Sequence, residues 1–101
     1  MKTILIVYTS KANLSKKEIA GLKKYAFISN SDLKVGDHIE SKEYTTNMLV
    51  VKVLDEKFEY FNSATGELSN KFNSTAQWEI RELFIREESE TIVYGKLLNR
   101  D

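Results

Sequence analysis

The chain of 101 residues contains no cysteine and no proline, and it has a single histidine. Without cysteine there is neither a disulfide nor a thiolate, so cysteine nucleophiles and sulfur-ligated zinc sites are excluded. One histidine leaves little for another kind of metal centre, and we predict no metal site and no cofactor. A chain of this length is expected to form one domain, residues 1–101, with a modest core and no room for a deep cofactor cleft.

Long apolar runs are also missing. The longest, residues 4–8, is too short for a membrane span or for the apolar part of a signal peptide. We therefore expect a cytoplasmic protein with no membrane partner. The nucleophile elbow, the phosphate-binding Walker loop and the HExxH metal motif do not occur in the sequence, and we predict that the protein is not an enzyme. The lone His38 is expected on the polar face of a strand.

The charges balance overall but are unevenly distributed. Residues 1–52 hold nine lysines and five acidic residues, which gives +4, whereas residues 53–101 hold six basic and ten acidic residues, which gives −4. Such asymmetry can mark a surface for a polyanion, or it can reflect two solvated faces of different charge. The basic first half motivates a search for a binding patch.

Strand patterns dominate the chain. Residues 3–9 are β-branched or aromatic almost throughout, which predicts a strand covered on both faces. A hairpin is expected where two strand-like segments flank residues 63–66, with Gly66 in the left-handed conformation. Gly36 is expected to form a sharp corner before a strand. Further strands are predicted at residues 25–28, 38–41, 48–54 and 91–98.

One short helix is expected after the first strand. Ser15 and Glu18 have the spacing of a capping box, in which each side chain accepts a hydrogen bond from the backbone of the other residue. Gly21 weakens the helix, which we expect to end near Lys24.

Residues 77–88 match both a helix and two alternating strand segments. We favour a strand with a bulge at Glu82, because β-branched and aromatic residues recur there. The sequence thus predicts a mostly β, β-rich α+β fold: a small antiparallel barrel-like sheet with one short helix.

A basic and aromatic patch is the strongest functional signal. Lysines neutralise phosphates and aromatic rings stack on unpaired bases, so such a patch would suit single-stranded nucleic acid. The alternative is that the tyrosine at position 25 belongs to the core and the lysines are merely solvated. The predicted nucleic-acid-binding residues are Lys23, Lys24, Tyr25, Lys42 and Tyr44.

Part of the chain resembles a known family. Tyr25, the corner LKVGDHIES (33–41), the strand NMLVVKVL (47–54) and the segment IRELFI (80–85) are similar to the N-terminal DNA-binding domain of the primosomal replication-restart helicase. The resemblance implies a small domain that binds the 3′ end of a nascent DNA strand. Lys24 stands where that family has an aspartate, and Ile28 where it has a proline.

Two function classes follow. The first is a small non-enzymatic nucleic-acid-binding-like module of a phage, plasmid or other mobile element. The second is a protein-binding accessory factor, or an inhibitor of a host defence enzyme such as a CRISPR nuclease. A continuous face of lysine and tyrosine would favour nucleic acid. A face dominated by glutamates would favour a basic groove on a protein partner; the glutamates concerned are Glu79, Glu82, Glu87, Glu88 and Glu90.

Overall fold

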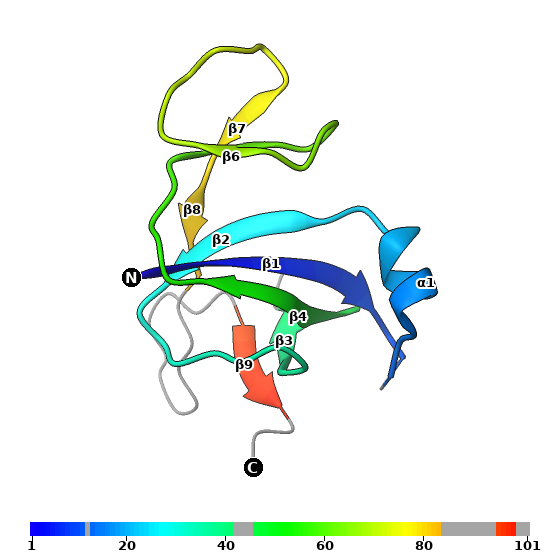
Figure 1. Ribbon diagram of the computed structural model, residues 1–101. Coiled ribbons are helices and arrows are strands. Elements are labelled where there is room, and N and C mark those ends of the chain that lie inside the picture. The colour runs from blue at the N-terminus through cyan, green and yellow to red at the C-terminus, as the bar shows by residue number, and fades with distance from the viewer. Residues whose placement is uncertain (12, 42–45, 84–94, 99–101) are drawn as a thin grey trace.

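The computed structural model of the protein describes residues 1–11, 13–41, 46–83 and 95–98 (Figure 1). Within these residues there are nine strands and one short helix. The elements are β1 (Lys2–Thr9), α1 (Lys16–Ala20), β2 (Tyr25–Ser29), β3 (His38–Ser41), β4 (Asn47–Leu54), β5 (Tyr60–Asn62), β6 (Leu68–Ser69), β7 (Gln77–Glu79), β8 (Arg81–Glu82) and β9 (Gly95–Leu98).

The strands form two sheets, which confirms the mostly β fold. The larger sheet has six strands in the order β8-β2-β1-β4-β3-β9 and curls into a half-barrel. The smaller sheet, in the order β6-β5-β7, lies above it in Figure 1. All pairs are antiparallel except β2 and β8, which run parallel. The exception arises because the chain enters β8 from the smaller sheet, not through a hairpin from β2.

The strand β1 is covered on both faces, as its sequence predicts. Successive side chains of a strand point to opposite faces, so Ile4 and Ile6 enter one apolar cluster and Leu5 enters another. The first cluster lies inside the half-barrel and consists of Ile4, Ile6, Phe27, Leu33, Ile39, Met48, Val50 and Leu83. The second joins the two sheets and consists of Leu5, Ile28, Phe61 and Ile80.

The helix α1 begins at the predicted capping box. Ser15 Oγ accepts from the Glu18 N–H at 3.2 Å, and Glu18 Oε1 accepts from the Ser15 N–H at 3.2 Å. The helix ends at Ala20, however, not near Lys24. None of its residues is buried, so no tertiary packing supports further turns, and Gly21 forms its C-cap. Lys24 Nζ instead donates to the carbonyl of Ile19 at 3.0 Å.

Two of the predicted turns are confirmed by their backbone angles. Gly36 has φ +97° at the corner before β3, and Gly66 has φ +78° in the hairpin between β5 and β6. Both angles lie in the region that side chains with a Cβ rarely adopt. In the hairpin, Asn62 Oδ1 accepts from the N–H groups of Ala64 (2.9 Å) and Thr65 (3.2 Å), which fixes the loop.

The segment that begins at Gln77 is strand and not helix as far as residue 82. The break falls at Ile80 and not at the predicted Glu82, because β7 pairs with β5 while β8 pairs with β2. Ile80 is buried at this crossing, and its N–H donates to the carbonyl of Glu59 at 2.8 Å. Residues 84–88 of this prediction lie outside the described part of the chain.

The structure describes the second half of the last predicted strand. Of residues 91–98, the structure describes 95–98, which form β9. His38 is buried and does not lie on an exposed polar face, so that prediction was wrong. Among the residues that the structure describes, no helix has the length and apolar character needed to cross a membrane.

The first test of the fold concerns Leu83, which anchors the end of β8. Its side chain is 2% exposed in the first cluster, and its N–H donates to the carbonyl of Ile28 at 2.8 Å. We expect Leu83→Ala to lower the free energy of unfolding by about 2–5 kcal/mol, measured by urea denaturation. Val35→Ala is the control, because Val35 is 65% exposed and its loss should stay within about 0.5 kcal/mol. Equal losses would contradict the packing described.

The second test concerns the pKa of Glu18. A hydrogen bond from Lys11 Nζ at 2.8 Å, and next the backbone N–H of Ser15, lower this pKa below its ordinary value of 4.5. A carboxylate with a lowered folded-state pKa stabilises the folded chain above its unfolded-state pKa, and this stabilisation disappears as the pH falls through the folded-state pKa. We therefore expect the capping box to open below pH 4.5, as followed by NMR titration of the Glu18 carboxyl.

Two lysine variants test what lowers the pKa of Glu18. Lys11→Gln should move the pKa of Glu18 back toward its ordinary value, because the largest contribution comes from Lys11. Lys16→Gln, on the same exposed helix, removes the same charge and should leave the pKa nearly unchanged. An ordinary pKa for Glu18 in the unaltered protein would disprove the arrangement.

Candidate functional site: a basic and aromatic groove

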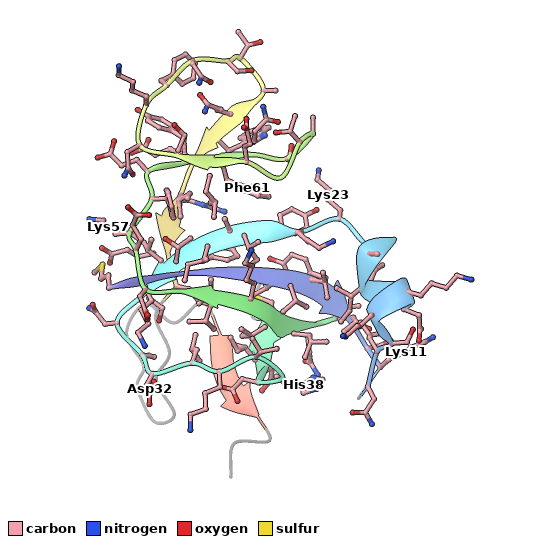
Figure 2. The ribbon with its side chains drawn as sticks, viewed as in Figure 1. Lys11, Lys23, Asp32, His38, Lys57 and Phe61 are labelled. Atoms are coloured by element: carbon pink, nitrogen blue, oxygen red, sulfur yellow. The ribbon has the colours of Figure 1, made fainter. Side chains whose placement is uncertain are left out.

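A groove of about 610 Å³ lies where the two sheets diverge. It exists because the chain leaves the smaller sheet at β7 and joins the larger one at β8, so that β7 stands apart from β2. In Figure 2, Phe61 lies between the smaller sheet and β2. The residues that line the groove are Lys23, Lys24, Tyr25, Ala26, Phe27, Phe61, Ser63, Trp78, Glu79, Ile80 and Arg81.

The charge of the groove is mainly positive. Lys23, Lys24 and Arg81 face a single carboxylate, Glu79, among the lining residues. The two lysines are held differently. Lys23 Nζ lies 5.3 Å from the centre of the Tyr25 ring, a cation–π contact. Lys24 Nζ donates to the carbonyl oxygens of Ile19 and Leu22 at the end of α1, so its charge is fixed at one end of the groove.

Two aromatic side chains in the groove are exposed. Tyr25 is 37% exposed, and its ring packs edge-to-face on Tyr8, with 5.0 Å between the ring centres. Trp78 is 68% exposed. Residues directly opposite each other in an antiparallel pair point to the same face, and Trp78 lies opposite Phe61. Because Phe61 packs toward the larger sheet, Trp78 stands on the groove side of the smaller sheet.

The structure brings together three of the five predicted binding residues. Lys23, Lys24 and Tyr25 share one groove, and Tyr25 is partly exposed, not buried in the core. Lys42 and Tyr44 lie outside the described residues. The lining of the groove comes from three segments of the chain: residues 23–27, Phe61 with Ser63, and residues 78–81.

Sequence reasoning missed Trp78 and Arg81 as groove residues. Both were expected on a strand, and both are. The one tryptophan of the chain, set among polar neighbours in QWEIRE, is the signal that could have drawn attention to this segment. The pattern does not reveal which sheet the segment joins, and that choice decides what Trp78 faces.

A second, smaller hollow of about 330 Å³ adjoins the groove and shares Glu79 and Ile80 with it. Its charge is mainly negative, since Glu59, Glu79 and Glu82 line it together with Lys57. Within the described ranges, no cluster of three or more histidine, aspartate or glutamate side chains is arranged to hold a metal ion. Basic and acidic surfaces thus meet along the chain from β7 to β8.

Trp78 allows a direct test of the groove, because it is the only tryptophan in the sequence. An indole that is 68% exposed should emit like tryptophan in water and be accessible to soluble quenchers. Because three cations and one carboxylate line the groove with it, iodide should quench it more efficiently than caesium at equal concentration. Exchanging Lys23 and Arg81 for glutamine should reduce this difference, whereas Lys71→Gln, outside the groove, should not. Blue-shifted emission that resists both quenchers would contradict the exposed position of Trp78.

The groove combines open aromatic faces with fixed positive charge, an arrangement suited to a ligand that carries both flat apolar rings and anionic groups. No protein-family model matches the chain, and no match was found among curated proteins or among solved structures.

Proposed function

We propose that the protein is a non-enzymatic module that binds single-stranded nucleic acid in the groove. One observation carries the proposal: the exposed Trp78 and Tyr25 share a groove with Lys23, Lys24 and Arg81. Proteins that bind single strands combine a positively charged groove with aromatic side chains on which bases stack. The groove offers both features within one short stretch of surface.

The dimensions of the site favour a single strand over a duplex. Stacking on Trp78 requires a base whose face is open, and the bases of a duplex are already stacked on each other. A volume of about 610 Å³ is within the range of sites for single small ligands. It therefore suits one or two nucleotides and not the width of a double helix.

The resemblance to the restart-helicase domain agrees with this proposal. It covers Tyr25 and the segment 80–85, which includes the groove residues Ile80 and Arg81. The family's aspartate is replaced by Lys24, whose side chain is bound to the end of α1. Binding in the groove is therefore proposed on phosphate neutralisation and stacking, and recognition of a 3′ end is not part of the proposal.

A protein-binding role is the second candidate, and the acidic hollow favours it. Glu59, Glu79 and Glu82 would attract a basic segment of a protein partner. This is the arrangement expected of an accessory factor or of an inhibitor that occupies a nucleic-acid-binding groove on a defence enzyme. The acidic hollow shares Glu79 and Ile80 with the groove but contains none of its cations, so substitutions of Lys23 and Arg81 separate the two candidates.

The proposal is tested by fluorescence anisotropy with a labelled oligothymidylate of twelve nucleotides and with a matched duplex. We expect the single strand to bind more tightly than the duplex. Each neutralised phosphate contributes about 0.7 to the salt dependence on single strands, so three cations predict a log–log slope near −2. Trp78→Ala should weaken binding by about 1–3 kcal/mol if a base stacks on the indole.

Matched variants outside the groove provide the control. Phe72→Ala removes another exposed aromatic ring, and Lys71→Glu reverses another exposed lysine. Both should bind like the unaltered protein, whereas Lys23→Glu with Arg81→Glu should not. Absence of binding at tens of micromolar protein in low salt, or equal binding by the groove variants, would refute the proposal and favour the protein-binding role.

A further inference from the structure

The first half of β2 has a neighbouring strand on one side only. β1 pairs with β2 along its whole length, from Tyr25 to Ser29, whereas β8 pairs only with Phe27 and Ile28. The strand edge is therefore open from Tyr25 as far as the N–H of Ala26, and both residues line the groove. Five consecutive residues, 23–27, line it. Side chains alternate between the two faces of a strand, so this continuous lining indicates that the backbone edge itself borders the groove.

The peptide groups of this edge have a defined direction. The carbonyl of Ile28 accepts from the N–H of Leu83 at 2.8 Å, so the backbone of Ile28 faces away from β1. In an antiparallel pair, alternate residues face the partner strand. The N–H of Ala26 therefore also faces away from β1, and the N–H of Tyr25 faces β1.

The carbonyl of Lys24 completes the edge. It belongs to the same trans peptide unit as the N–H of Tyr25, and the two groups of such a unit point in opposite directions. The carbonyl of Lys24 thus faces away from β1, next to the N–H of Ala26. One acceptor and one donor, two residues apart, are directed to the groove side of β2.

The open edge is short, which favours a nucleobase over a peptide as its ligand. A peptide that adds to a sheet gains its affinity from main-chain hydrogen bonds repeated along a strand. Here β8 pairs with β2 from Phe27 onward, so few such bonds are open to a peptide. A nucleobase needs only one donor–acceptor pair, and unpaired bases are commonly recognised on their Watson–Crick edge. We infer that the Lys24 carbonyl and the Ala26 N–H bind the Watson–Crick edge of one unpaired base while Trp78 stacks on its face.

This inference rests on the proposed binding of single strands and adds how a base is held. It predicts a preference that phosphate contacts and stacking alone do not produce, namely for a base whose Watson–Crick edge is free. Thymine offers its N3–H to the carbonyl and an exocyclic oxygen to the N–H. Methylation of N3 removes this donor and blocks the edge, but it leaves the phosphates and the ring face in place.

The experiment compares oligothymidylate with the same oligonucleotide built from N3-methylthymidine, using the unaltered protein. Loss of two hydrogen bonds should weaken binding of the methylated strand about tenfold or more. Equal affinity for both strands would overturn the inference and leave the proposed function intact. If neither strand binds, the proposed function fails and the inference fails with it.

A variant assigns the effect to the edge. Ala26→Pro removes the proposed donor, the N–H of residue 26. No hydrogen bond to β1 is lost, because this N–H faces away from β1, and proline is tolerated at such positions of an edge strand. This variant should bind the unmethylated strand less tightly and should lose most of the discrimination between the two strands. Ala26→Ser retains the N–H and should discriminate like the unaltered protein.

The fold of both variants is checked by circular dichroism. Full discrimination by a folded Ala26→Pro protein would overturn the assignment to the β2 edge. If Ala26→Pro does not fold, the comparison of the two strands with the unaltered protein decides the matter alone.

Discussion

Burial of both faces of β1 is the constraint on which the rest of the structure depends. Ile4 and Ile6 fill the half-barrel, while Leu5 on the opposite face is covered by residues that include Phe61 of the smaller sheet. A chain of this size has few residues with which to cover both faces of a central strand. The smaller sheet covers the outer face only in part, and the groove lies where this cover ends.

The crossing at Ile80 connects the core to the groove. Ile80 is buried in the second cluster and bonded through its N–H to Glu59, so the positions of the residues on either side of it are fixed. Trp78 then belongs to the smaller sheet and Arg81 to the larger one. The same short crossing leaves the first half of β2 without a second neighbour. Packing in the core thus determines the aromatic, the cationic and the open-edge character of the groove.

Hydrogen bonds and a cation–π contact hold two lysine side chains of the groove in place. Lys24 is held by the carbonyl groups at the end of α1, and Lys23 by the ring of Tyr25. Such side chains lose less conformational freedom on binding an anion than fully mobile lysines would. The early end of α1, which leaves carbonyl groups available to Lys24, is therefore relevant to the site as well as to the fold. Glu79 borders both the groove and the acidic hollow, so the two surfaces of opposite charge are adjacent.

Local sequence determined the strands, the capping box of Ser15 and Glu18, and the left-handed turns at Gly36 and Gly66, because alternation, cap spacing and glycine act within a few residues. It also placed Lys23 to Tyr25 together, since they are consecutive. Tertiary structure alone decided that the chain changes sheets at Ile80, that β8 runs parallel to β2, and that Trp78 joins Tyr25 in one groove. These outcomes depend on which buried face each segment covers, and that is a competition among segments far apart in the chain.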